Sequence, residues 1–190
     1  MAGDDQLDCE DKLKLDDLSN QLSKIEHFGE ARKIKESEVI SALEVLGKDA
    51  KLKNHATFHQ YTYFLNKHGA RGNFYLDLYG ADPMLEGEKD LTDYYVELQE
   101  EFVKIYRERV LDDEKMDCCW EIARTDTGEV YYISVSEKGS GCIFALDRYG
   151  EIRFYAKNFI RFLEQIHDFF VYVIKGDGMH HYEKSAESTE

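Results

Sequence analysis

The sequence predicts a single α+β domain in which an antiparallel β-meander packs against several helices. Three observations predict this class. Apolar residues recur at helical spacing over most of the first 110 residues, short runs separated by turn residues follow between residues 118 and 156, and an amphipathic helical pattern returns after residue 156. A chain of 190 residues has the usual size of one domain, and its hydrophobic fraction of 43% is sufficient for one core.

Three amphipathic helices are predicted in the first 70 residues. The first is expected to end near Gly29 and carries an apolar stripe of Leu15, Leu18, Leu22 and Ile25. The second begins after a Ser37 cap and ends before Gly47, with a stripe of Val39, Ile40, Leu43 and Leu46. The third lies between an Asn54 cap and Gly69, and its apolar face consists of Phe58, Tyr61, Phe64 and Leu65.

A short strand and a long helix are predicted next. Residues 74–78 alternate in the manner of a strand, and residues 80–83, which include the single proline, break the run. A helix is then predicted over residues 90–110, because apolar residues recur at spacings of four, three, four and three: Leu91, Tyr95, Leu98, Phe102 and Ile105. The other face of this helix consists mostly of Glu.

Four short runs from residue 118 onward predict the meander. They cover residues 118–124, 129–136, 142–146 and 151–156, and the intervening segments have the composition and length of hairpin turns. The run 142–146 is apolar throughout and is expected at the centre of the sheet. In the last run, one set of side chains is expected to be buried (Ile152, Phe154, Ala156) and the alternate set to face water (Glu151, Arg153, Tyr155).

A C-terminal helix is expected to cover this sheet. Its apolar stripe is broad and consists of Phe159, Phe162, Leu163, Ile166, Phe170 and Val173. The chain is thus divided into an acidic N-terminal helical extension (1–30), the α+β domain (31–175) and a flexible polar tail (176–190).

Composition favours a cytoplasmic protein. No stretch approaches the ~20 consecutive apolar residues of a membrane helix, and the first residues lack the basic and apolar regions of a signal peptide. The four cysteines are too few and too irregularly spaced for a disulfide framework, so reduced thiols are expected at Cys9, Cys118, Cys119 and Cys142.

The acidic charge is concentrated in two segments. The net charge is −15, with nine acids against three bases in residues 1–30 and fourteen against five in residues 77–117. Such a field repels nucleic acid and favours basic partners, so direct nucleic-acid binding is not expected. Solubility alone is the simpler explanation of the charge and stays open.

No pattern of residues typical of catalysis is present, and no cofactor is expected. His55 and His59 would share a helix face and chelate one metal ion, but a third ligand is missing and ordinary packing is the preferred interpretation. A flexible tail is the preferred interpretation of the pair His180 and His181, and a solvated helix exit is the preferred interpretation of the acidic cluster 112–114. Four tyrosines are expected to pack on the sheet or to anchor an interface: Tyr131, Tyr132, Tyr149 and Tyr155.

Three features, in order along the chain, resemble the SUKH superfamily. A Leu46-Gly47 helix end precedes a helix that finishes in Tyr63, Phe64, Leu65, Asn66, Lys67, His68 and Gly69, a β-meander follows, and the closing segment is Ala156, Lys157, Asn158, Phe159, Ile160, Arg161, Phe162 and Leu163. The similarity covers residues 37–170. This chain departs from the family pattern at His68, Gly69 and Ala70, which replace a paired-glycine turn, at Asn158, and in its added helices.

The resemblance implies a non-enzymatic binding domain. Many members of the superfamily are immunity proteins that neutralise a bacterial toxin, and others are regulators, so a toxin partner and a regulatory scaffold without a toxin both stay open. A metal-dependent hydrolase is the enzymatic alternative. For a basic partner such as a nuclease toxin, the expected contact residues surround the long acidic helix: Asp82, Glu86, Glu88, Asp90, Asp93, Glu97, Glu100 and Glu101.

Overall fold

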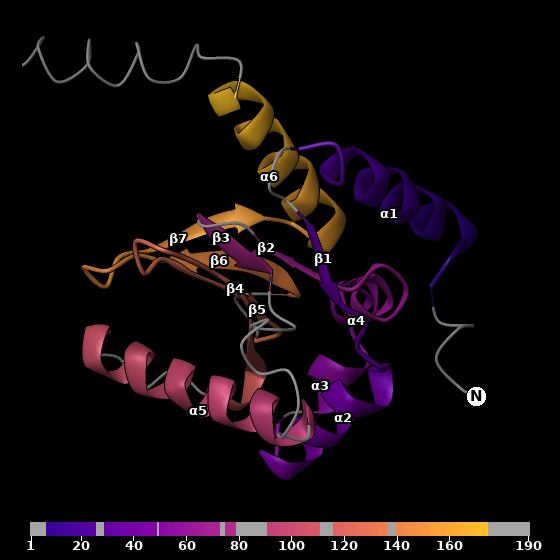
Figure 1. Cartoon of the computed structure of the whole chain (residues 1–190). Coiled ribbons are helices and arrows are strands. Elements are labelled where there is room, and N and C mark those ends of the chain that lie inside the picture. The colour runs from indigo at the N-terminus through magenta and orange to yellow at the C-terminus, as the bar shows by residue number, and fades with distance from the viewer. Residues whose placement is uncertain are drawn as a thin grey trace, which may run out of the picture.

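The computed structural model describes residues 7–25, 29–48, 50–72, 75–78, 91–110, 116–136 and 140–174. Within these residues it confirms the α+β class, with one antiparallel sheet that has helices on both faces. α1 (Cys9–Leu22), α4 (Ala56–His68) and α6 (Phe159–Ile174) pack together on one face, and α5 (Leu91–Arg109) lies across the other (Figure 1). α2 (Glu36–Val45) contacts both α4 and α5 and so joins the two layers.

Seven strands follow one another across the sheet in chain order. They are β1 (Gly29–Arg32), β2 (Ala70–Gly72), β3 (Leu76–Leu78), β4 (Cys119–Thr125), β5 (Val130–Ser134), β6 (Cys142–Leu146) and β7 (Ile152–Ala156). β4 to β7 form the predicted meander, and β3 is the predicted short strand. β1 and β2 were not predicted, because strands of four and three residues rich in Gly, Ala and Arg carry no alternating apolar pattern.

The helix ends show why capping predictions miss by one or two residues. α2 begins after Lys35, whose backbone N–H donates to the Glu38 carboxylate at 2.8 Å, and so the predicted Ser37 cap is wrong. α4 is capped by His55 in place of Asn54, since the His55 Nδ1 accepts from the Thr57 N–H at 3.2 Å. Of these two residues, His55 caps its helix with its own side chain, whereas Lys35 makes no side-chain cap hydrogen bond.

Two short elements complete the architecture. α3 (Ala50–Lys53) precedes α4, and the 3-10 turn η2 (Met116–Cys118) leads into β4. Gly47 and Gly69 follow α2 and α4 with φ values of 62° and 81°, so both predicted glycine stops are confirmed.

The core has two parts, and α5 contributes side chains to both of them. The larger contains α1, α2, α4, α6 and the first half of α5, with Trp120 between the rings of Phe58 and Tyr95. The smaller lies under the second half of α5, where Phe102 and Tyr106 pack on Tyr132 of β5. α5 is therefore buried along its whole inner face.

The N-terminal helix shares the larger core. Leu15 and Leu22 of α1 are fully buried, and Asp16 accepts from Lys67 Nζ at 2.6 Å and lies 2.8 Å from His68 Nε2 on α4. Segment 1–30 thus includes a helix that belongs to the packed core. The predicted tail, residues 176–190, lies outside the described residues.

The predicted orientation of the last strand is wrong. Ile152 and Phe154 are 36% and 60% exposed, whereas Tyr155 is half-buried against Tyr131 and Phe162. A β-bulge explains the difference, because Ile143 pairs with Ala156 and Phe144 pairs with Phe154, which leaves Tyr155 as the extra residue. The bulge turns both Tyr155 and Ala156 toward α6.

The centre of the sheet lies two strands earlier than expected. β6 lies next to the edge strand β7, while β4 is the middle strand and β5 is buried at every position. Among the described helices, none has the length and apolar character needed to cross a membrane.

Candidate functional site

The outer face of α5 gathers the predicted contact residues that the structure describes. Asp93, Glu97, Glu100 and Glu101 are all exposed on it, opposite the buried stripe that holds the helix on the sheet. The other four predicted residues, Asp82, Glu86, Glu88 and Asp90, lie outside the described residues. The sequence therefore placed these four carboxylates correctly on one solvent face.

Charge is ordered along this face. From Leu91 to Val103, α5 carries four acids and no base, and the bases Lys104, Arg107 and Arg109 follow in its last two turns. This order agrees with the helix dipole, which favours anions near the N-terminus and cations near the C-terminus. The result is a negative surface on the first half of the helix and a mixed one on the second.

A buried glutamine, Gln99, joins α5 to the sheet through two hydrogen bonds. The Gln99 side-chain amide donates to the Glu121 backbone carbonyl at 3.0 Å and accepts from the Glu121 N–H at 2.9 Å. These bonds reach β4 at its bulge, where the register shifts between Glu121 and Ala123 and strand pairing is irregular. Gln99 has no exposed surface, so both bonds are shielded from water.

An ion-pair chain runs from the sheet to the acidic face. The Arg124 guanidinium donates to both carboxylate oxygens of the fully buried Glu121, at 3.0 and 3.1 Å. Its third nitrogen donates to Glu101 at 3.0 Å, and Glu101 remains 55% exposed. Glu101 is thus held in one position, whereas Glu121 is enclosed and neutralised by its partner.

The C-terminal end of α5 is attached to two hairpin turns. Arg109 Nη1 donates to the carbonyl oxygens of Gly128 and Asp147, at 2.8 and 3.2 Å. The Gly150 backbone approaches so closely that a Cβ there would lie 2.2 Å from the Arg109 carbonyl oxygen. The helix is therefore fixed at its middle by Gln99 and at its end by the β4–β5 and β6–β7 turns.

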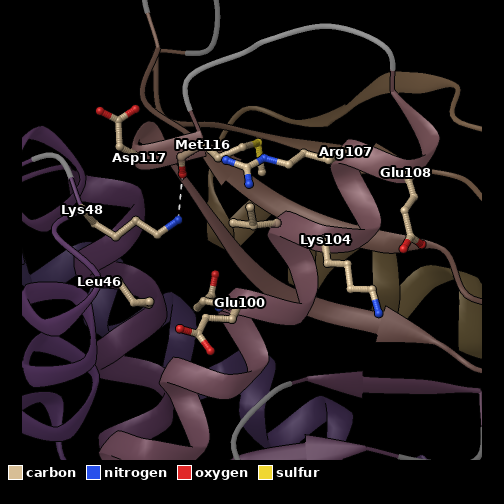
Figure 2. Close-up of a pocket in the computed structure, with 10 residues that line it drawn as sticks. Leu46, Lys48, Glu100, Lys104, Arg107, Glu108, Met116 and Asp117 are labelled. Atoms are coloured by element: carbon tan, nitrogen blue, oxygen red, sulfur yellow. Dashed lines mark hydrogen bonds between the residues drawn. The ribbon is translucent and has the colours of Figure 1, made fainter.

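A groove of about 590 Å³ runs beside α5, between the end of α2 and η2 (Figure 2). Its apolar lining comes from Leu46, Val103 and Met116, and its charged lining from Lys48, Glu100, Lys104, Arg107, Glu108 and Asp117. Lys48 Nζ donates to the Met116 carbonyl at 2.7 Å, and burial lowers the pKa of this ammonium. A groove with this lining can take up a long side chain that has an apolar stem and a polar end.

His55 and His59 differ in their position relative to α4. His55 lies outside α4 as its cap, and its ring is packed beneath Gly141, where a Cβ would meet it at 1.7 Å. The predicted pair on one helix face is therefore wrong. His59 Nδ1 lies 4.0 Å from Glu36 Oε1, and burial lowers the pKa of both imidazoles. Over the described ranges, no three His, Cys, Asp or Glu side chains gather around a metal position.

The tyrosines divide between core and surface. Tyr131 and Tyr132 are buried on opposite faces of β5, and Tyr155 packs against Tyr131 with ring centroids 4.7 Å apart. Tyr149, at the β6–β7 turn, is 77% exposed and stacks with the Arg148 guanidinium at 4.7 Å. The other residues considered above as metal ligands and not preferred, His180, His181 and the cluster 112–114, lie outside the described residues.

Sequence reasoning missed the residues that position the site. Gln99 and Glu121 occur within apolar patterns, where a polar side chain at a buried position signals an internal hydrogen bond or ion pair. This signal is visible in the sequence. The sequence does not reveal which residue each of them contacts, because the two residues of each contact are distant along the chain.

The chain was compared with protein-family models, curated proteins and solved structures, and none of them matches it. The resemblance to the SUKH superfamily therefore stays a prediction from short motifs, and function is inferred from the geometry around α5.

Proposed function

We propose that this chain is a non-enzymatic binding domain whose outer α5 face receives a basic surface of another protein. One observation carries the proposal. Four exposed carboxylates, with no base between them, lie on a helix that side-chain and backbone contacts fix to the sheet: Asp93, Glu97, Glu100 and Glu101.

Fixation of α5 favours binding over mere solubility. A surface that is already in its bound geometry loses less conformational entropy on association. Arg124 orients Glu101, and the Gln99 bonds prevent α5 from shifting along β4. Exposed carboxylates that only keep a protein soluble need no such support.

The groove beside α5 offers the apolar contact that the carboxylates do not provide. Complementary charge mainly raises the association rate and specificity, whereas apolar contact supplies most of the affinity. The groove adjoins the acidic face at Glu100 and is lined by Leu46, Val103 and Met116. An arginine or lysine of the partner would place its stem on this apolar lining and its charge beside Glu100.

The partner that fits the resemblance is a toxin. Enzymes that cut nucleic acid carry a basic phosphate track, and an acidic helix can occupy such a track in place of the substrate. The protein would then be an immunity protein that acts from the cytoplasm, without cofactor and without contact to nucleic acid or membrane. A regulatory scaffold that uses the same face without a toxin is the rival binding function.

The decisive experiment first examines the neighbouring genes for a secreted protein with a C-terminal toxin domain and then uses that domain in a catalytically inactive form. Asp93, Glu97 and Glu100 are changed together to Lys, and association with the toxin domain is measured at several salt concentrations. We expect association to slow by roughly tenfold to a hundredfold at low salt, with a weaker salt dependence. Co-expression with the active toxin should rescue cells with the wild-type chain but not with this variant.

A matched control separates location from net charge. The exposed acids Glu10, Asp126 and Asp168, changed together to Lys, alter the net charge equally but are not part of the acidic face of α5. Equal loss of binding in both variants would contradict placement of the interface on α5. Failure of the wild-type chain to bind or to rescue would contradict the immunity function and leave the scaffold function.

One observation favours the enzymatic alternative. The buried His59 Nδ1 has no hydrogen-bond partner among the described residues, so its lone pair is available to a metal ion. Metal analysis of untagged protein decides this. Stoichiometric zinc that disappears when His55 and His59 are both changed to Ala would favour a metal-dependent hydrolase over a binding domain.

A further inference from the structure

An aromatic row on the sheet ends at an open edge. Tyr132 stacks on Phe144 with ring centroids 5.9 Å apart, and Phe144 meets Phe154 edge-on at 6.2 Å. α5 covers the Tyr132 end of this row, whereas Phe154 is 60% exposed and Ile152 beside it is 36% exposed. β7 is the last strand of the sheet, and no described strand pairs with its outer edge.

An open edge with exposed apolar side chains is a template for another strand. Proteins usually protect such edges with charges that face the apolar side or with a covering loop. On β7 the side chains that face the α5 side of the sheet are Ile152 and Phe154. The one charged residue within the strand, Arg153, faces the opposite side, where it forms an ion pair with Glu129. Within the described residues the bulge at Tyr155 interrupts the strand, and it leaves residues 152–154 regular.

The charges at the two ends of β7 are self-complementary. Glu151 precedes the strand and Lys157 follows it, and both are exposed without an ion-pair partner in the described part of the chain. When two copies of this strand run antiparallel with Phe154 at the centre, Glu151 of each copy comes beside Lys157 of the other. The segment therefore favours its own copy over an unrelated strand.

We propose that β7 is a dimerisation edge at which two copies of the chain pair antiparallel about a two-fold axis at Phe154. Phe154 then contacts Phe154 of the second copy, so that the two aromatic rows become one row of six rings. Arg153 lies opposite Tyr155 of the second copy. Such an isologous contact closes after two copies and does not form fibres.

The bulge limits the strength of this dimer. Because the bulge turns Tyr155 and Ala156 toward α6, regular pairing with the second copy is limited to the few residues around Phe154. The contact is therefore small, and we expect a reversible dimer with a dissociation constant in the range of about 1 to 100 µM.

Sedimentation velocity of the full chain tests the proposal. The wild type should pass from monomer to dimer between about 1 and 500 µM. Phe154→Asp should weaken the dimer at least tenfold, because it puts two like charges at the two-fold axis. Phe169→Asp is the matched control, since Phe169 is 52% exposed on α6, away from the edge, and this change should leave the dimer unaffected.

A charge exchange tests the register without altering any ring. Glu151→Lys alone and Lys157→Glu alone should each weaken the dimer, and the double variant should restore it, because the exchanged charges again lie opposite one another. This result would hold even where Phe154→Asp disturbs folding. A wild type that stays monomeric at the highest concentration would overturn the proposal. So would a dimer that the Phe154 change leaves intact, or a double variant no stronger than the single ones.

Discussion

Replacement of Gln99 by Leu tests whether α5 is fixed through the bulge of β4. The change keeps a side chain of similar size in the buried space between helix and sheet but removes both hydrogen bonds to the Glu121 backbone, at 2.9 and 3.0 Å. The Glu121 N–H and C=O lie at buried positions beside the bulge of β4, and the change takes away the two hydrogen bonds that Gln99 supplies to them.

The expected magnitude follows from those two backbone groups. A buried donor or acceptor left without a partner costs about 1–3 kcal/mol, so two of them cost about 2–6 kcal/mol. Leucine recovers part of this through its apolar surface, and we expect a net loss of about 3 kcal/mol in the free energy of unfolding. For a chain of 190 residues this corresponds to a fall of roughly 6–12 °C in melting temperature.

Urea denaturation and calorimetry provide the measurement. Gln165→Leu is the control, because Gln165 is exposed on α6, and its effect should stay within about 0.5 kcal/mol. A loss below about 1 kcal/mol for Gln99→Leu would refute the reasoning, since it would mean that water or a backbone shift satisfies both groups.

Two further predictions concern the attachment of α1 and of α5. Burial opposes ionisation of Asp16, but hydrogen bonds from Lys67 and His68 on α4 outweigh burial and lower its pKa. The ionised carboxylate therefore contributes to the free energy of unfolding at neutral pH, and this contribution is lost as pH falls below about 4. Asp16→Asn should therefore cost about 1 kcal/mol at pH 7 and little at pH 3 in urea melts, and a pH-independent cost would contradict this. Gly150→Ala should destabilise more than Gly47→Ala by about 1–3 kcal/mol. Both glycines have positive φ, but only at Gly150 would a Cβ meet backbone, the Arg109 carbonyl at 2.2 Å; equal costs would refute that contact.

Helices and meander strands were predictable because their signals are local. α5 follows from the spacing of its apolar residues, and β6 was predicted to the residue. The facing of β7 was not predictable, since the bulge at Tyr155 arises from pairing with β6 and leaves the alternating pattern of the sequence unchanged. A period-two pattern thus identifies a strand but cannot identify its buried face where a bulge intervenes.

The acidic face of α5 was predictable for the same local reason. The contacts that fix α5 to the sheet were not predictable. Spacing places Asp93, Glu97, Glu100 and Glu101 on one side of a helix. The support comes from contacts that join residues 19 to 38 positions apart, namely Gln99 with Glu121, Arg124 with Glu101, and Arg109 with the two turns. Such contacts depend on tertiary packing, which composition and periodicity do not encode.

The two proposed surfaces are connected by the same contacts. Arg109 attaches the end of α5 to the β6–β7 turn, and β7 begins immediately after that turn. A dimer formed through β7 would therefore hold its two α5 faces in a fixed relation, and neither face would be covered, because the two-fold axis lies at Phe154 on the strand edge. Two partner molecules could then bind one dimer. Where the partner is itself a dimer, binding of its second subunit to the second α5 face takes place within the complex already formed. The overall affinity then exceeds that of a single α5 face, although each face makes the same contacts. Phe154→Asp should then weaken binding to a dimeric partner and leave binding to a monomeric one unchanged, whereas the Asp93, Glu97 and Glu100 changes should weaken both.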